Sequence, residues 1–249
     1  MIYNITMEYI QNVAEYYDEL YPVTDTQKKF YANIKKSYPM PVKFLQIGCG
    51  TGALEHVLAQ DGSDVTGLEV SKELIAAASL RKRTQLTAVR FFQLSTLDMT
   101  RFLGKGFYNV ISCLNSRIIF IHDRTLLKKF FFDSKTLLSK NGTLVLSLLN
   151  FHHAEQSEVT QLPELSSIRV KMISSLKKNG ANLMYLNQQI ETGNGKILKV
   201  MDNEEIYPLM KEEIVKFGKE AGFAEFYFYD SFNMDEYTNK GNMLICVMK

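Results

Sequence analysis

The sequence predicts a doubly wound α/β protein with a mostly parallel seven-stranded sheet, an antiparallel last strand, a helical N-terminal cover and a small antiparallel β insertion. Three observations predict it. Apolar runs of strand length alternate with helical segments over residues 42–150, hairpin turns replace this alternation over 151–207, and the α/β pattern resumes over 208–249. With 46% hydrophobic content, 249 residues are enough to bury one substantial core.

Residues 1–41 are predicted to form the helical cover. Thr24 is a plausible N-cap three residues before Gln27, and the apolar residues Phe30 and Ile34 lie four apart, so they share one helix face. Such a segment is expected to lie on the core as a lid or flanking layer.

Residues 42–150 are predicted to be the cofactor-binding core, in which turn clusters separate strands from helices. Asp61-Gly62-Ser63-Asp64 is one such cluster, and Asn141-Gly142 is a helix stop ahead of the fifth strand. The expected strands are 44–47, 65–68, 89–94, 108–114 and 143–149, and the expected helices are 53–60, 72–83 and 123–139.

Residues 151–207 are predicted to begin with a polar loop, 152–167, and to continue as an antiparallel meander. Turns at Asn179-Gly180 and at Gly193-Asn194-Gly195 join three runs, 168–176, 182–192 and 196–207. The core then resumes over 208–249 with a helix at 211–221 and strands at 225–229 and 243–248. About a dozen residues join these last two strands, which predicts antiparallel neighbours.

Composition narrows the function. The apolar runs fall short of the roughly 20 residues of a membrane helix, and the N-terminus lacks a secretory pattern, so we expect a cytoplasmic protein with no membrane partner. Three separated cysteines without CxxC spacing indicate neither a metal site nor a disulfide framework. The net charge of +2 comes from scattered basic pairs, which makes nucleic acid an unlikely partner.

The most informative segment is the apolar strand at 44–47 followed by Gly48, Gly50 and Gly52. A turn without side chains lets the backbone approach a ligand, and the helix that starts near Ala53 directs free N–H groups at the same place. The loop satisfies both G-x-G-x-G and the dinucleotide pattern G-x-G-x-x-A, so alone it does not decide between two cofactors. Glu69, which ends the next strand, can accept hydrogen bonds from ribose hydroxyls.

Later segments resemble the class I S-adenosylmethionine-dependent methyltransferases, and Tyr16 to Tyr21 looks like the aromatic N-terminal segment of their small-molecule branch. The likeness covers most of the chain. It is carried by the glycine loop, Glu69-Val70-Ser71, Phe92-Gln93-Leu94-Ser95, Tyr108-Asn109-Val110-Ile111, the run from Leu137 to Thr143, and Ala221-Gly222-Phe223.

The resemblance implies S-adenosyl-L-methionine as cofactor. The glycines would admit its methionine part and ribose, Glu69 would hold the ribose hydroxyls, and Ser95 and Thr96 would lie beside the adenine. The implied cofactor-binding residues are Tyr21, Gln46, Gly48, Cys49, Gly50, Gly52, Glu69, Val70, Ser95, Thr96 and Leu114, with Tyr17 and Asn115 toward the acceptor. Two alternatives stay open: Glu69 as a cap of the helix that follows, and Leu114 as a core residue.

Three positions depart from the family pattern, which usually has acids where this chain has Gln46, Ser95 and Asn109. Gln46 still accepts a hydrogen bond but lacks the charge that favours the cofactor's ammonium, and Ser95 is a shorter acceptor for the adenine amine. Weaker binding or loss of activity are both consistent with these changes.

Methyl transfer depends chiefly on holding a nucleophile in line behind the methyl carbon. Tyr17 and Tyr21 are candidates for a cation–π contact with the sulfonium, against the alternative that they pack the N-terminal helix onto the sheet. If the acceptor must lose a proton, His152 and His153, after the fifth strand, are better placed than His56 or His122, although loop histidines are commonly solvated.

The predicted function is therefore S-adenosylmethionine-dependent methylation of nitrogen or oxygen on a small-molecule acceptor. The β insertion either walls the acceptor pocket or forms a homodimer contact. The alternatives are a non-catalytic binding or scaffold protein of the same fold, a nicotinamide-dependent oxidoreductase, and a methyltransferase acting on RNA or protein.

Overall fold

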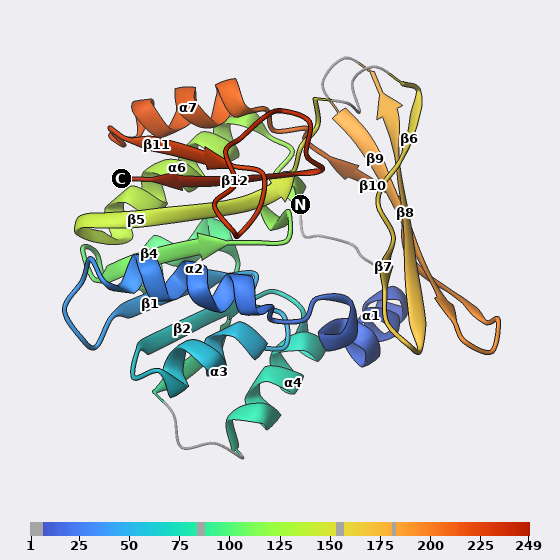
Figure 1. The fold of residues 1–249 in the computed structure, drawn as a ribbon, viewed down its shortest axis with the longest axis horizontal. Coiled ribbons are helices and arrows are strands. Elements are labelled where there is room, and N and C mark those ends of the chain that lie inside the picture. The colour runs from blue at the N-terminus through green and yellow to red at the C-terminus, as the bar shows by residue number, and fades with distance from the viewer. Residues whose placement is uncertain (1–6, 84–87, 153–156, 181–182) are drawn as a thin grey trace.

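The computed structural model describes all residues except 1–6, 84–87, 153–156 and 181–182. Its large sheet has the order β11-β12-β5-β4-β1-β2-β3, in which only β12 runs antiparallel to its neighbours (Figure 1). The predicted fold class is confirmed, as is the antiparallel pairing of the last two strands. The strands are β1 (Lys43–Ile47), β2 (Asp64–Glu69), β3 (Val89–Gln93), β4 (Tyr108–Cys113), β5 (Leu138–Leu149), β11 (Phe226–Tyr229) and β12 (Met243–Met248).

Helices cover both faces of this sheet because neighbouring strand residues point to opposite sides. Val110 packs with α2 and α3 in one hydrophobic cluster, while Ile111 packs with α6 and α7 in another. The helices are α2 (Asp25–Lys35), α3 (Ala53–Gln60), α4 (Lys72–Arg83), η1 (Thr96–Asp98), α5 (Met99–Phe102), η2 (Arg117–Phe120), α6 (Arg124–Leu137) and α7 (Lys211–Glu220).

The N-terminal cover consists of α1 (Met7–Leu20) and α2. The predicted cap of α2 is confirmed: Thr24 and Gln27 form a capping box, in which each side chain accepts a hydrogen bond from the other residue's backbone N–H. Phe30 and Tyr31 are buried on the large sheet, where the Tyr31 hydroxyl donates to Ser112 Oγ on β4 at 2.9 Å. Helix α2 is therefore part of the core.

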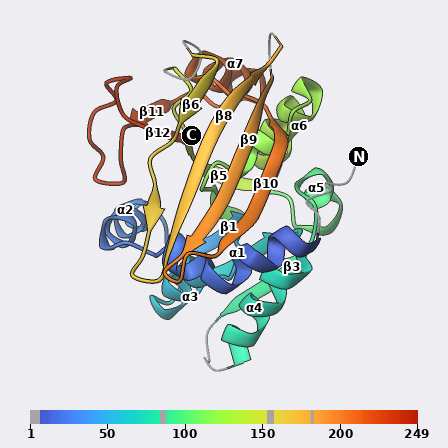
Figure 2. The ribbon, with the colours of Figure 1, turned by 90° about the vertical axis from the view of Figure 1, so that its right-hand side faces the viewer.

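The second sheet is the predicted antiparallel meander, with the order β10-β9-β8-β6 and β7 paired to β8. Helix α1 lies between this sheet and the carboxyl edge of the large sheet, and Leu20 packs with Val170, Met172 and Ile190 (Figures 1 and 2). The strands are β6 (Val159–Gln161), β7 (Leu165–Ser166), β8 (Val170–Asn179), β9 (Leu183–Thr192) and β10 (Ile197–Ile206).

Three local predictions were wrong. Residues 152–167, expected as a loop, contain β6 and β7, which pair with the outer edge of β8. Strand β5 begins at Leu138, five residues early, because Leu138 already pairs with Tyr108 before a bulge at Asn141 (φ 62°). The short helices α5, η1 and η2 were not predicted. Among the described residues, no helix has the length and apolar character to cross a bilayer.

Candidate functional site

The glycine turn between β1 and α3 lies where the chain order of the large sheet reverses, since β1 pairs with β2 on one side and β4 on the other. The N–H groups of Gly48 and Cys49 both donate to the Leu68 carbonyl, at 2.8 and 2.9 Å, and hold the turn against β2. Gly52 begins α3 at φ 75° without a side-chain cap, so the first turn of α3 keeps unpaired N–H groups. Such a terminus favours negatively charged or strongly polar ligand atoms.

All three glycines are required by close packing as well as by their positive φ angles. A Cβ at Gly48 would lie 2.7 Å from Arg117 Cγ, and one at Gly52 would lie 2.5 Å from Phe91 Cζ. A Cβ at Gly50 would collide with the phenol ring of Tyr17. The turn is therefore a cradle that the protein's own side chains fill in this conformation.

Glu69 holds the second side of the cradle. Its Oε2 accepts from Gly50 N at 3.0 Å, while Oε1 accepts from Val70 N and Ser71 N at 2.8 and 3.0 Å. The residue is 4% exposed. A carboxylate has about four acceptor positions, so three are used and one remains for a ribose hydroxyl. The capping alternative is thus correct for Oε1, which binds the N-terminus of α4, while Oε2 faces the glycine turn.

Helix α1 closes the crevice. The Tyr17 ring is buried over Gly50 and lies 5.0 Å from the ring of Tyr21. Asp18, the next residue, accepts a hydrogen bond from Thr51 Oγ1 and pairs with Arg81 on α4. Burial raises the pKa of Tyr17 to about 12, which keeps the phenol neutral at physiological pH. In this conformation Tyr17 and Tyr21 pack helix α1 onto the glycine turn, which was the alternative to a contact with the sulfonium.

A pocket of about 40 Å³ remains beneath Tyr17 and Tyr21, enough for a few water molecules and far less than a nucleoside needs. Gln46 and Glu55 contribute its polar groups, and the Gln46 amide has no hydrogen-bond partner within the described chain. The pocket is lined by Tyr17, Tyr21, Val23, Gln27, Gln46, Gly48, Cys49, Ala53, Leu54, Glu55, Leu114 and Asn115.

Glu55 is a buried ionisable group at this site. Its side chain is buried, 1% exposed, and its Oε2 has no hydrogen-bond partner among the residues described. Burial raises the pKa of its carboxyl to about 8, so the group is largely protonated at neutral pH. Burial also raises the pKa of the Cys49 and Cys113 thiols, which makes both poor nucleophiles.

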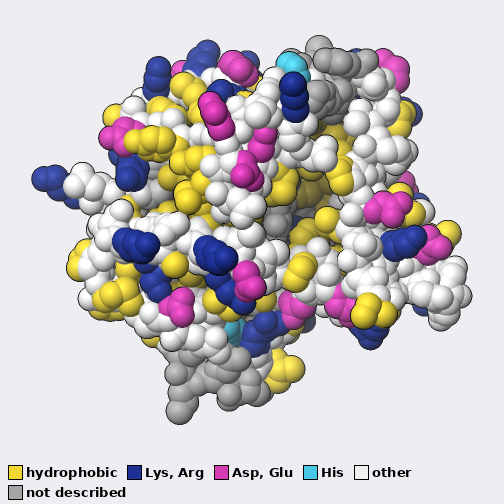
Figure 3. Space-filling view, in the orientation of Figure 1, with side chains coloured by type: hydrophobic (Ala, Val, Ile, Leu, Met, Phe, Trp, Pro, Cys, Tyr) yellow, Lys and Arg dark blue, Asp and Glu magenta, His cyan; other side chains and the backbone are white. Residues whose placement is uncertain are grey.

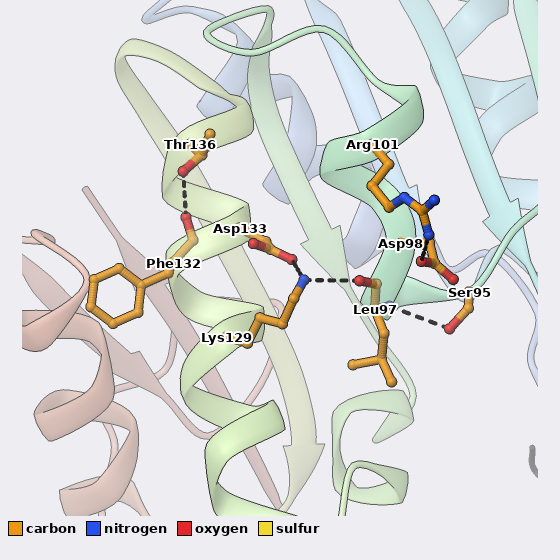
Figure 4. A network of polar contacts seen from close by, with 8 residues as sticks. All are labelled: Ser95, Leu97, Asp98, Arg101, Lys129, Phe132, Asp133 and Thr136. Carbon is orange, nitrogen blue, oxygen red and sulfur yellow. Dashed lines mark hydrogen bonds and ion pairs between the residues drawn. The ribbon is translucent and has the colours of Figure 1, made fainter. Parts of the chain in front are cut away.

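Ser95 and Thr96, assigned to the adenine side, lie at the start of η1. The Ser95 hydroxyl accepts from Leu97 N at 3.3 Å, and Lys129 fixes the same turn by donating to the Leu97 carbonyl at 2.8 Å (Figure 4). Val70, which follows the carboxyl end of β2, is exposed. Asn109 is structural, because its Oδ1 accepts from Lys43 N at 2.9 Å and its amide donates to Ser139.

His152 lies elsewhere, on a pocket of about 240 Å³ formed at the end of β5, the start of α7 and the segment before β12. This pocket shares no lining residue with the glycine crevice. His153 falls outside the described residues. His56 is buried in α3, and His122 precedes α6, as the sequence predicted. Hydrophobic side chains line the hollow between the large sheet and the second sheet in the view of Figure 3.

Sequence reasoning missed three residues that shape the site. From the sequence, no role was assigned to Asp18 or to Glu55, although Glu55 interrupts the apolar face of α3. Arg117 opens η2, four residues after the end of β4, and precedes the apolar run Ile118–Ile121. A single charge at the carboxyl end of a central strand, ahead of four apolar residues, was a usable signal for a buried functional group.

Comparison with known proteins agrees with this geometry. Residues 41–213 match the sequence profile of a family described as a methyltransferase domain. Over 142 residues the chain is 25% identical to a candidate methyltransferase of Geobacillus sp. (strain WCH70), an alignment that covers 55% of this chain and 56% of the relative. The chain thus spans about half the length, or less, of the curated relatives it matches.

Solved structures share the whole fold. The CcbJ methyltransferase from Streptomyces caelestis superposes with a TM-score of 0.78 at 17% identity, covering 95% of each chain. CalS10 from Micromonospora echinaspora, an amino pentose methyltransferase, superposes with a TM-score of 0.69 at 19% identity and covers 95% of this chain and 96% of that one. At these identities the likeness establishes the common fold, including the second sheet.

Proposed function

The chain belongs to the methyltransferase-domain family, and on that premise we propose that it transfers a methyl group from S-adenosylmethionine to nitrogen or oxygen of a small-molecule acceptor. One observation carries the proposal: the glycine turn, the uncapped start of α3 and the Glu69 carboxylate meet at the point where the strand order reverses. Open α/β sheets bind nucleotide ligands at such points.

The residues of the cradle fit this cofactor, provided that α1 moves. Glu69 retains an acceptor position for the ribose, the turn has no side chains of its own, and Gln46 offers an unpaired amide toward the methionine part. Tyr17 and the stem of Arg117 occupy the space over the glycines, so binding requires Tyr17 to leave with α1 and the Arg117 stem to shift off Gly48. S-adenosylmethionine supplies a methyl group on a positively charged sulfur, which neutral aromatic faces such as Tyr17 and Tyr21 favour.

The acceptor is proposed to enter between α1 and the second sheet. The Tyr21 hydroxyl already contacts Met172 Sδ on β8 at 3.5 Å, so this tyrosine joins the crevice to the inner face of that sheet. Asn115, exposed at the end of β4, lies on the same side. CalS10, with the same architecture, is an amino pentose methyltransferase, which supports an amine-bearing or hydroxyl-bearing small molecule.

The remaining roles are proposals of the same kind. His152 or His153, which follow β5, would take the proton of the acceptor, and this role requires that segment to approach the crevice, because the pocket lined by His152 shares no residue with it. A homodimer through the second sheet is the competing use of that surface, which sedimentation velocity tests directly. RNA is not the proposed acceptor, and the cytoplasm remains the predicted location.

Calorimetry with S-adenosylhomocysteine tests the function. We expect micromolar binding by the full chain and at least tenfold weaker binding of NADH. Methylation of a panel of amino sugars and small phenols, followed with radiolabelled S-adenosylmethionine, would then identify the attacking atom. Absence of binding at millimolar S-adenosylhomocysteine, or tighter binding of NADH, would overturn the proposal.

A non-catalytic binding protein is the second candidate, and one observation favours it. The crevice is closed by Tyr17 and Arg117, and the charges at positions 46 and 95 are absent. Such a protein would bind S-adenosylhomocysteine yet methylate nothing in the panel. Turnover of any acceptor decides between the two candidates.

A further inference from the structure

Arg117 carries the least satisfied charge of the site. Its Nε atom is buried without a hydrogen-bond partner, and Arg117 makes no ion pair with a carboxylate in the part of the chain that the structure describes. Among the residues described, the guanidinium makes one hydrogen bond, from Nη2 to the Tyr17 hydroxyl at a long 3.5 Å. A guanidinium has five N–H donors and stays charged at any physiological pH, so most of its hydrogen-bonding capacity is unused.

The nearest opposite charge does not satisfy it. Glu69 interacts with Arg117 through space, but its two oxygens already accept three backbone N–H groups of the glycine turn and of α4. The other titratable groups near the guanidinium are the phenols of Tyr17 and Tyr21 and the thiols of Cys49 and Cys113, all neutral at physiological pH. Arg117 is partly buried and its Nε fully so, and keeping an unpaired charge out of water is costly, which indicates a partner that the described residues do not provide.

Arg117 lies where it can contact a ligand bound at the glycine turn. The Arg117 side chain passes over Gly48, so closely that a Cβ there would lie 2.7 Å from its Cγ. The guanidinium carbon lies 6.0 Å from the centre of the Tyr17 ring, on α1. If α1 lifts, the guanidinium loses the one hydrogen-bond acceptor that the described residues offer it, as the crevice opens.

We propose that Arg117 is an anchor for a carboxylate of a bound ligand, at the junction of the glycine turn and the acceptor side. The inference rests on the proposed function and extends it to ligand class. Guanidinium and carboxylate match as a planar, two-bond pair. Glu69 nearby favours a singly charged carboxylate over a doubly charged phosphate, because the repulsion grows with ligand charge.

Two ligands can bring this carboxylate: the amino-acid part of the cofactor, or the acceptor. The first arm of the experiment compares S-adenosylhomocysteine with its decarboxylated analogue by calorimetry, in wild type and in Arg117→Gln. If the cofactor supplies the group, Arg117→Gln weakens S-adenosylhomocysteine about 10- to 100-fold and leaves the analogue unchanged. Arg124→Gln, an exposed arginine on α6, is the matched control and should change neither affinity.

The second arm adds benzoate or benzamide to the protein saturated with S-adenosylhomocysteine and measures the shift in unfolding temperature. If the acceptor supplies the carboxylate, benzoate stabilises the wild type more than benzamide does, and Arg117→Gln removes the difference. Arg117→Lys, which keeps the charge without the planar fork, should recover only part of the preference in either arm.

The comparison of each carboxylate ligand with its uncharged counterpart can be made on the wild-type protein alone. The proposal therefore stays testable if Arg117→Gln unfolds. Equal affinity for both cofactor analogues together with equal shifts for benzoate and benzamide would overturn the carboxylate anchor. That result, obtained with normal S-adenosylhomocysteine binding, leaves the proposed function intact. No binding of S-adenosylhomocysteine by the wild type would instead refute the proposed function.

Discussion

Asp18 on α1 accepts a hydrogen bond from the hydroxyl of Thr51 in the glycine turn, and its other oxygen pairs with Arg81 on α4. One carboxylate therefore fastens the cover to the loop beneath it and to the neighbouring helix. Because its side chain is about half exposed, this latch is a weak one that a ligand can open.

Asp18→Ala should speed ligand association. The variant removes the two polar contacts of Asp18 with the glycine turn and α4, so the open state becomes more populated and stopped-flow binding of S-adenosylhomocysteine should accelerate severalfold. Global stability should fall by no more than about 1 kcal/mol, as expected for an exposed pair.

Hydrogen exchange of the α1 amides should quicken in the same variant, whereas Asp25→Asn, an exposed residue on α2, should leave association and exchange unchanged. Unaltered association in Asp18→Ala would show that α1 does not control entry.

Gly50→Ala should be far more disruptive than its backbone angle alone predicts. The new Cβ collides with the Tyr17 ring, so α1 must shift and S-adenosylhomocysteine binding should be lost. Gly106→Ala is the matched control, because Gly106 has a similar φ of 63° and open space around it. That variant should lose about 1 kcal/mol in denaturant unfolding and bind normally.

Removing the Tyr17 ring tests whether the steric collision causes the loss of stability in Gly50→Ala. Tyr17→Ala combined with Gly50→Ala should recover part of the stability lost in Gly50→Ala. Additive losses in the double variant would contradict the steric explanation.

Glu55→Gln should change how stability depends on pH. The carboxyl binds its proton up to about pH 8 in the folded protein but only to about pH 4.5 when unfolded. Between these values the unfolded chain releases the proton first, so wild-type stability falls as pH rises. The glutamine variant escapes this loss and should exceed wild type by a few kcal/mol near pH 8, at about 1.4 kcal/mol per pKa unit.

Urea unfolding at pH 4.5, 6 and 8 measures this trend. Glu191→Gln, an exposed change on β9, should follow the wild-type pH profile. A constant difference between Glu55→Gln and wild type across this range would mean that Glu55 has an ordinary pKa in the folded state.

Tyr31→Phe should cost about 1–3 kcal/mol, because it leaves Ser112 Oγ buried without its partner on α2. Ser112→Ala should cost a similar amount, and the double variant should cost less than the sum. Denaturant unfolding of the four proteins gives the coupling energy. Additivity would show that α2 docks through its apolar face alone.

The large sheet could be predicted because strand-length, mostly apolar segments alternate with helical ones and are bounded by turn residues, which is typical of a parallel sheet. The meander likewise followed from Asn179-Gly180 and Gly193-Asn194-Gly195. Strands β6 and β7 could not be predicted, since each has only two or three residues, too few for an alternating pattern, and pairs with the outer edge of β8.

At the site, the glycine turn and Glu69 were predicted in place, but their partners were not. Glu69 was predicted to hold ribose hydroxyls, which stays a prediction; in this conformation its oxygens bind the backbone of the turn and of the start of α4. Arg117 and Asp18 act through contacts between segments a hundred residues apart or on different helices, and sequence spacing contains no information on such contacts.

Helix α1 has two occupied sides. Toward the core, Tyr17 and Asp18 hold the glycine turn, while toward the second sheet Leu20 joins the apolar cluster of Val170 and Met172, and Glu19 accepts from Ser167 Oγ at 2.8 Å. A displacement of α1 away from the glycine turn must therefore drag or release its contacts with the second sheet. On the proposed function, the donor side and the acceptor side are coupled through this one helix, so filling either side changes access to the other.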